Sequence, residues 1–100
     1  MYKVKHSKQA KKDAVNIRRS GLRPQVEEII ATIEQNPYER SQSFKELKGR
    51  LKGKYSRRIN DEHRFVYEVR PNTENEKNEK DMPYKGIIWT LSMWSHYESI

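Results

Sequence analysis

The sequence predicts an α+β domain in which two N-terminal helices pack on a twisted, mainly antiparallel sheet of four strands. Residues 1–6 alternate in the period-two pattern of a half-buried strand, with Tyr2, Val4 and His6 on one side. Two segments with helical spacing follow, and three further predicted strands occupy the second half of the chain. A chain of 100 residues has room for one modest core, so we expect a single domain over residues 1–100.

Two helices are expected after the first strand. The first is predicted from Lys8 to Arg19, where Ser7 can cap its start and Ser20-Gly21 can end it. The second has Pro24 near its first turn and ends at Asn36-Pro37. We expect both helices to be scaffold that covers one face of the sheet. The apolar residues of the second helix that have the spacing of a buried face are Val26, Ile29, Ile30 and Ile33.

The segment from Lys54 to Val69 has the composition of a β-hairpin, with β-branched and aromatic residues on both sides of a polar turn. Its basic side chains would come together in space, because the two strands of a hairpin lie side by side. Period two places Arg57 and Arg58 on opposite faces, and it places His63 opposite to Arg64. A polyanion is the natural partner of the arginines, whereas for His63 a structural role at the strand start is preferred.

Two polar segments flank this hairpin. Residues 38–53 are interpreted as a long loop docked on the core, which brings Lys45, Glu46 and Lys48 next to the basic hairpin. Residues 70–85 are low in hydrophobicity and contain two prolines. We therefore expect an exposed, mobile excursion without a chemical role there.

The strongest strand signal is GIIWTLSMWSHY, residues 86–97. One alternating set of its residues, which contains Trp89, is expected to face the helices and to belong to the core. Trp94 and His96 belong to the other set and would look out from the opposite side, within reach of the arginines. Tyr97 would lie at the end of the strand.

The chain carries a formal charge of +7 that is unevenly spread. Residues 1–20 hold seven Lys or Arg against one Asp, and residues 45–70 hold nine against four acidic residues. Such an excess favours nucleic acid or an acidic protein as partner, although a solvated basic surface gives the same count. The absence of cysteine excludes disulfides, thiol catalysis and cysteine-based zinc sites. With no apolar leader and no apolar run of about 18 residues, we expect a cytoplasmic protein without a membrane segment.

These residue types suit chemistry on an RNA phosphate. Cleavage by the 2′-hydroxyl needs a base, cations that stabilise the charge at phosphorus, and an acid for the departing 5′-oxygen. A histidine such as His96 can exchange protons near neutral pH, and Arg58 and Arg64 offer planar forks for phosphate. Glu46 is a candidate base, and Trp94 could stack on an RNA base. Simple RNA binding by the same surface is the alternative.

The run YSRRINDEHRFVYEV, together with the C-terminal MWSHYE, resembles the Txe/YoeB family of toxins within the RelE-like superfamily. The order of strand, helix pair, loop and strands agrees with that family over nearly the whole chain. The resemblance implies a RelE-like fold and a bacterial toxin-antitoxin module. It implies a toxin that enters the ribosomal A site, cleaves mRNA without a metal or cofactor, and is held inactive by a YefM- or Axe-like antitoxin. The family also suggests a homodimer.

Carried over residue by residue, the resemblance assigns the family's arginines to Arg58 in SRR and Arg64 in EHR. It assigns the C-terminal catalytic pair to His96 and Tyr97, and the loop lysine to Lys48. In this scheme His96 is the acid, Tyr97 orients the phosphate, and the three cations neutralise it.

The resemblance does not fix the general base. The family's glutamate aligns with Lys45, while this chain has its acidic residue one position later, at Glu46. Either a flexible loop brings Glu46 to the site, or Lys45 acts there, or catalysis depends on the C-terminal pair and the arginines. Lys45, Arg57 and Trp94 are further expected RNA contacts, and Arg57 is expected to touch ribosomal RNA or an antitoxin rather than the reacting phosphate.

Two other functions stay open at this point. A ParE-like protein uses the same scaffold to inhibit gyrase and cuts no RNA, and a generic basic domain only binds RNA. The His96-Tyr97 ending argues against the first, since a pure binder needs no C-terminal imidazole. Residues 71–85 also depart from the family, for which we expect a shorter connection.

Overall fold

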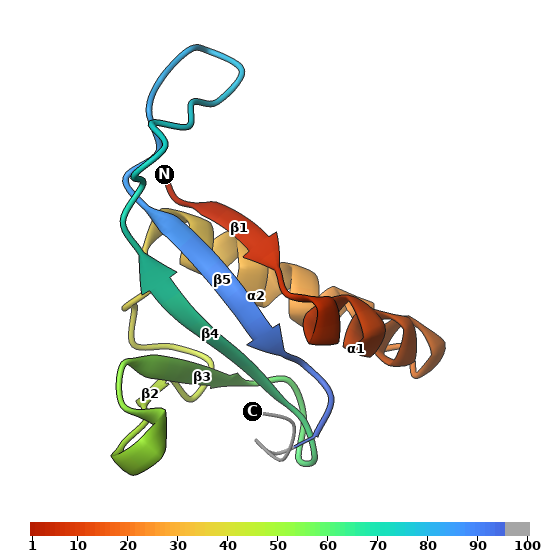
Figure 1. Ribbon diagram of the computed structural model, residues 1–100. Coiled ribbons are helices and arrows are strands. Elements are labelled where there is room, and N and C mark those ends of the chain that lie inside the picture. The colour runs from red at the N-terminus through yellow and green to blue at the C-terminus, as the bar shows by residue number, and fades with distance from the viewer. Residues whose placement is uncertain (96–100) are drawn as a thin grey trace.

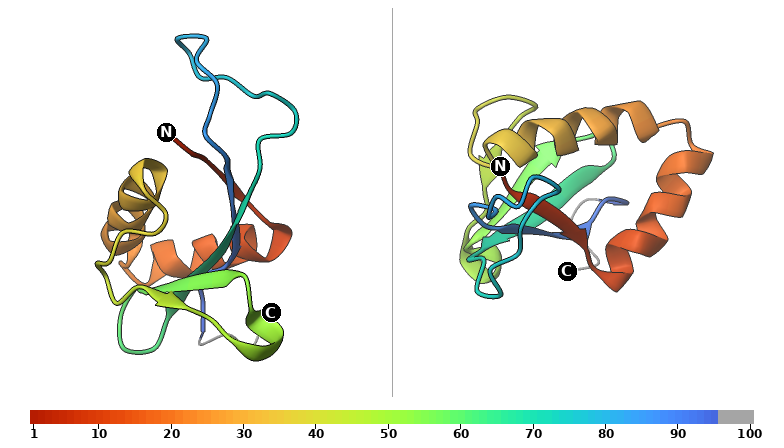
Figure 2. Two further views of the ribbon diagram at one scale, coloured as in Figure 1. Left: turned by 90° about the vertical axis from the view of Figure 1, so that its left-hand side faces the viewer. Right: turned by 90° about the horizontal axis from the view of Figure 1, so that it is seen from above.

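Figure 1 shows the structure, a computed structural model in which residues 1–95 are described. Helix α2 lies behind the sheet in this view, and α1 crosses the end at which β1 and β5 finish (Figures 1 and 2). No helix within residues 1–95 is long and apolar enough to cross a membrane. The elements are β1 (Lys3–His6), α1 (Lys8–Arg19), α2 (Arg23–Gln35), β2 (Lys45–Glu46), a short 3₁₀ helix (Gly49–Leu51), β3 (Lys54–Arg58), β4 (Arg64–Arg70) and β5 (Ile87–Ser92).

The sheet has the strand order β1-β5-β4-β3-β2. Strand β1 runs parallel to β5, and every other neighbouring pair is antiparallel. The predicted class, two helices on a mainly antiparallel sheet, is confirmed, but the sheet has five strands where four were predicted. The additional strand is β2, in the segment predicted to be a loop, where Lys45 and Glu46 pair with Ser56 and Tyr55. Two residues are too few for alternation to reveal a strand.

Local signals set both helices as predicted. The Ser7 hydroxyl accepts a hydrogen bond from the Ala10 amide at 3.0 Å, which caps α1. The chain leaves α1 through Gly21, whose φ of 73° is a left-handed conformation that glycine adopts without strain. The helices and the sheet enclose one core cluster. Its buried members are Ala10, Ile17, Val26, Ile29, Ile33, Ile59, Phe65, Tyr67, Ile88 and Met93.

Arg57 is fully buried and ties the segment after α2 to the sheet. Its guanidinium donates hydrogen bonds to the carbonyl oxygens of Pro37, Glu39 and Ser41 at 3.2, 2.8 and 2.9 Å, and to the Tyr67 hydroxyl at 3.1 Å. The expectation that Arg57 contacts RNA or an antitoxin is therefore wrong. Its fork instead satisfies backbone carbonyls that would otherwise be buried without a donor.

Tyr67 shares this buried network and gives the protein a specific alkaline sensitivity. Its hydroxyl donates to the Pro37 carbonyl oxygen at 2.5 Å, and burial raises the pKa of Tyr67 to about 12. A phenol whose pKa is higher in the folded than in the unfolded chain stabilises the fold fully below pH ~10, and this contribution is lost as the pH rises toward 12.

We therefore expect the free energy of unfolding to fall by about 2 to 3 kcal/mol between pH ~10 and ~12 because of Tyr67. Urea unfolding of wild type and Tyr67→Phe across this range measures it. The variant is expected to start less stable, because it lacks the hydroxyl, and to lose less stability with rising pH. Parallel pH curves for the two proteins would show that another group is responsible.

The face of strand β5 that packs against the helices is the opposite of the one predicted. Ile88 and Thr90 are fully buried on the helix side, whereas Trp89 is only half-buried on the other side, under a stacked arginine. Met93, which alternation alone places on the face of Trp89, does enter the core. A β-bulge, at which Tyr67 pairs with Thr90 but Val66 pairs with Ser92, reverses the alternation beyond Thr90. An interior strand is apolar on both faces, so its alternation could not tell which face meets the helices.

Residues 71–86 form an excursion beyond the end of the sheet (Figure 1). The segment extends from the body as predicted, but contacts that the sequence did not predict hold its base. The Asn72 side chain bonds the backbone of Glu76 and the carbonyl oxygen of Tyr84. Glu76 forms ion pairs with Lys3 at 3.5 Å and Lys5 at 2.7 Å, and the hydrogen bond from Lys5 lowers the pKa of this carboxyl.

Candidate functional site

Arg58 and Arg64 stand directly opposite each other at the end of the β3–β4 hairpin. Directly opposite residues share a face, and the neighbouring pair, Arg57 and Phe65, lies on the core side. The two arginines therefore lie on the side of the sheet away from the core, here called the open face. Like charges in this position cost stability, which favours an anionic ligand between them.

The two guanidiniums are held differently. Arg58 is exposed and forms an ion pair with Asp61 in the turn. Arg64 is half-buried, and its Nη1 donates to the carbonyl oxygens of Asn60 at 2.7 Å and His63 at 3.1 Å. Both of these bonds use one nitrogen, so within residues 1–95 the rest of the Arg64 fork can bind a phosphate.

The register of β2 separates the two candidate bases. Lys45 is paired with Ser56, which lies on the open face together with Arg58. Glu46 is paired with Tyr55 and therefore points to the opposite side of the sheet. The structure thus brings Lys45, and not Glu46, onto the arginine face.

Lys48 lies at the edge of a basic hollow of about 500 Å³ beside β2 and β3. Lys52 and Lys54 line the same hollow together with Glu46. Lys48 is exposed and begins the short 3₁₀ helix, so its side chain is accessible. Its contact with RNA stays a prediction.

His63 and Trp94 form a stacked pair below the hairpin turn. Their ring centroids are 3.9 Å apart with 18° between the planes. His63 Nδ1 accepts a hydrogen bond from the Ser95 amide at 2.8 Å, which agrees with the structural role preferred for this histidine. Trp94 follows the strand instead of belonging to it, and one face of its ring is covered by His63. Stacking of an RNA base on Trp94 stays a prediction.

His96 and Tyr97 lie outside the described residues. The residue before them is placed: the Ser95 carbonyl oxygen accepts from the Arg64 amide at 3.2 Å. The described chain therefore reaches the arginine end of the hairpin directly before His96. Among the described residues, this hydrogen bond is the only observation that bears on the predicted proximity of the C-terminal pair to the arginines.

Asp13 was missed by the sequence analysis. It lies in α1 and is 3% exposed, and its carboxylate accepts hydrogen bonds from the amides of Met93 at 2.9 Å and Trp94 at 3.3 Å. A signal was present, because Asp13 occupies the helical stripe of Ala10 and Ile17 that packs on the core. An acidic residue in such a stripe needs a buried donor.

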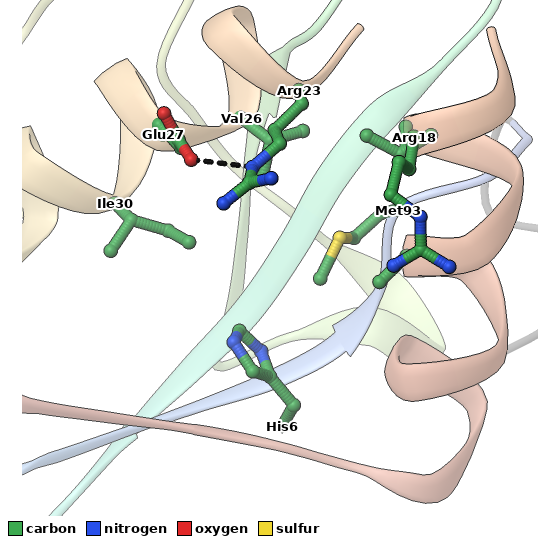
Figure 3. Close-up of a pocket in the computed structure, with 9 residues that line it drawn as sticks. His6, Arg18, Arg23, Val26, Glu27, Ile30 and Met93 are labelled. Atoms are coloured by element: carbon green, nitrogen blue, oxygen red, sulfur yellow. Dashed lines mark hydrogen bonds and ion pairs between the residues drawn. The ribbon is translucent and has the colours of Figure 1, made fainter. Parts of the chain in front are cut away.

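A cavity of about 310 Å³ lies on the helix side, between α1, α2 and the end of β1 (Figure 3). Arg18 and Met93 point into it from one side, and Arg23 faces them from α2 (Figure 3). Burial lowers the pKa of His6 at its floor, and the nearby Lys11 adds to this effect. The residues that line this cavity include none of those assigned to RNA chemistry, so the candidate site is the open face.

The sequence profile of one protein family matches residues 8–78, and this family is described as a YoeB-like toxin of a bacterial type II toxin-antitoxin system. The match covers more than half of the chain and includes Arg58 and Arg64. The chain belongs to the YoeB-like toxin family. The resemblance inferred from the SRR and EHR motifs is thus confirmed. The matched part of this YoeB-like toxin ends before β5.

Solved structures agree with this assignment. The YoeB dimer from Staphylococcus aureus is 29% identical with a TM-score of 0.70, over 96% of this chain and 98% of that chain. YoeB in the heterotetrameric YoeB-YefM complex from the same organism is 27% identical with a TM-score of 0.69, over 97% and 99%. A YoeB/ParE toxin from Agrobacterium tumefaciens is 23% identical with a TM-score of 0.76, over 95% and 99%, and shows the fold alone. No curated protein sequence matches the chain.

Proposed function

We propose that this YoeB-like toxin is an endoribonuclease that cleaves mRNA in the ribosomal A site and thereby inhibits translation. The observation that carries the proposal is the open-face pair of Arg58 and Arg64, with Ser95 hydrogen-bonded to the Arg64 backbone directly before the His96-Tyr97 pair. Family membership supports a toxin, and the arginine pair supports a phosphate as its target.

In the proposed reaction the 2′-oxygen of the RNA attacks the adjacent phosphorus and the bond to the 5′-oxygen breaks. The products are a 2′,3′-cyclic phosphate and a 5′-hydroxyl. Arg58 and Arg64, with Lys48, stabilise the negative charge that grows on the phosphate oxygens. His96 gives a proton to the departing 5′-oxygen, and Tyr97 orients the phosphate. Permanently charged guanidiniums supply the positive charge, so no step needs a metal.

The base is assigned differently from the first expectation. Because Glu46 and the arginines lie on opposite sides of the sheet, we propose that Lys45 contacts the phosphate and that Glu46 has no part in the reaction. The proton of the 2′-hydroxyl would then pass to water or to a ribosomal RNA group at the A site, because His96 enters the step protonated and Tyr97 orients the phosphate.

The matched substitutions Glu46→Gln and Lys45→Ala test this assignment. Glu46→Gln is expected to cleave within about twofold of wild type, while Lys45→Ala loses about tenfold or more, as expected for an electrostatic group at the phosphate. Single-turnover cleavage on ribosomes measures both. A loss of about 10²-fold in Glu46→Gln, the size expected for a general base, would restore that carboxylate to the mechanism.

The proposal includes the toxin's partners. YoeB of Staphylococcus aureus forms a complex with YefM and a dimer on its own. By analogy we propose that a YefM-like antitoxin holds this toxin inactive and that the free toxin forms a homodimer. Its targets, translating ribosomes with their mRNA, place its action in the cytoplasm.

Cell-free translation of a defined mRNA tests the function. Addition of the purified toxin is expected to stop protein synthesis and to leave mRNA fragments with 5′-hydroxyl ends, while DNA supercoiling by gyrase continues unchanged. Arrested supercoiling with intact mRNA would instead assign the ParE-like activity. Binding to RNA that weakens steeply with salt, without cleavage, would assign a generic RNA-binding domain.

A further inference from the structure

Three consecutive residues, 93 to 95, are held by groups from two distant parts of the chain. Asp13 on α1 receives the amides of Met93 and Trp94, as described above, and its other carboxylate oxygen accepts from the Gln9 side chain at 2.8 Å. His63, in the hairpin turn, receives the amide of Ser95. All three backbone amides directly before His96 are therefore bound to a side chain.

Side-chain packing holds the same three residues. Met93 is 2% exposed and extends into the space between α1 and α2 (Figure 3). The Trp94 ring is stacked on His63. Ser95 has a φ of 99°, a conformation that non-glycine residues rarely adopt and that persists only where the surroundings fix it. The backbone of residues 93–95 is thus set by contacts rather than by local preference.

Stabilisation of the fold does not by itself account for a buried aspartate at position 13. A buried carboxylate pays a desolvation cost, and within residues 1–95 Asp13 forms no ion pair that would offset it. Its partners are instead two backbone amides and one side-chain amide. What these hydrogen bonds do achieve is to fix the chain at residues 93 and 94, immediately before the segment that carries His96 and Tyr97.

We infer that Asp13 and His63 are positioning residues of the proposed ribonuclease, which fix residues 93–95 so that His96 and Tyr97 meet the phosphate held by Arg58 and Arg64. The inference rests on the proposed function, because the placement of residue 96 matters for cleavage only if His96 acts there. A displacement of about 1 Å in a reacting group can cost up to 10²-fold in rate.

Two substitutions of His63 separate its two contacts. His63→Asn keeps an acceptor at the place of Nδ1, since the asparagine carbonyl oxygen lies there, and removes the stacked ring. His63→Phe keeps the ring and removes the acceptor. We expect His63→Phe to lower the single-turnover rate on saturating ribosomes about tenfold or more, and His63→Asn to retain most of it. Affinity for the ribosome should change less than about twofold in both, because neither substitution removes a phosphate contact.

Two substitutions of Asp13 make the same comparison, acceptor kept against acceptor removed, for the amides of residues 93 and 94. Asp13→Asn keeps an oxygen acceptor for the amides of Met93 and Trp94, whereas Asp13→Ala removes it, and we expect a loss of about tenfold in rate for the alanine variant alone. Amide hydrogen exchange of residues 93–95 provides a readout that does not depend on cleavage. The exchange should become faster in His63→Phe and Asp13→Ala than in their matched partners.

The outcomes are distinguishable. If wild type cleaves and His63→Phe cleaves at the same rate although its Ser95 amide exchanges faster, the inference is overturned and the proposed function stands. If His63→Phe and His63→Asn lose rate equally, the acceptor has no role and the inference is again overturned. If wild type leaves ribosome-bound mRNA intact, the proposed function fails and the inference fails with it. Should Asp13→Ala not fold, the two His63 variants decide.

Discussion

The Arg64→Ala variant is expected to cleave ribosome-bound mRNA about 10²-fold more slowly than the wild-type toxin. Arg64 lies on the open face opposite Arg58, and part of its fork stays accessible after its bonds to the turn. A guanidinium placed in advance beside the phosphate stabilises the charge that develops there at no further ordering cost. Arg64→Lys keeps a charge without the planar fork and is expected to fall between wild type and the alanine variant.

Arg70→Ala is the matched control. Arg70 lies on the same strand and the same face but at the far end, where it stacks on Trp89 and pairs with Glu68. Its removal takes away the same charge and should change the cleavage rate less than about twofold, since surface substitutions away from the site have small effects. Equal losses in the Arg64 and Arg70 variants would mean that net charge, and not a placed guanidinium, drives the activity. Urea unfolding of each variant shows whether a lower cleavage rate comes from a smaller fraction of folded protein.

Replacing Arg57 with alanine is expected to lower the free energy of unfolding by about 3 kcal/mol or more. The buried guanidinium serves the carbonyl oxygens of Pro37, Glu39 and Ser41, and its carbon lies 4.8 Å from the Phe44 ring centroid. Alanine leaves these acceptors without a donor and leaves a cavity. Arg57→Lys is expected to be destabilising too, because one ammonium cannot reach acceptors arranged around a planar fork.

The neighbouring Arg58→Ala is the control for this prediction. Arg58 is exposed and faces Arg64, so its removal should change stability by less than about 0.5 kcal/mol. For the cleavage rate we expect the opposite order of the two variants. Arg58→Ala removes a contact with the phosphate, whereas Arg57→Ala removes none. Equal unfolding midpoints in urea for Arg57→Ala and Arg58→Ala would contradict the structural role of Arg57.

The helices were predictable because their signals are local. The bounds of α1 follow from a capping serine and a glycine within two residues of its ends, and the buried face of α2 follows from its own spacing. The opposite orientation of Arg57 and Arg58 also followed from period two. Which of the two arginines is buried did not follow from the sequence, because this depends on residues 37–41, 16 to 20 positions before Arg57, folding back over the sheet.

The orientation of the candidate base could not be predicted for the same reason. Glu46 was named because it is the acidic residue one position after Lys45, with which the family's glutamate aligns, but the pairing of β2 with β3 decides which of the two residues lies on the arginine face. A shift of one residue reverses every side chain of a strand, so a motif offset by one position lands on the other side of the sheet. The role of Asp13 depends on amides 80 residues away and could be suspected only from its place in an apolar stripe.

The most direct test of the central claim adds the purified toxin to ribosomes programmed with one defined mRNA and maps both new ends, with naked mRNA and His96→Gln alongside. The account predicts cuts at the A-site codon that leave a 5′-hydroxyl, require the ribosome, and fall by about 10²-fold in His96→Gln. Intact mRNA on the ribosome, or equal cutting of naked mRNA, would contradict it.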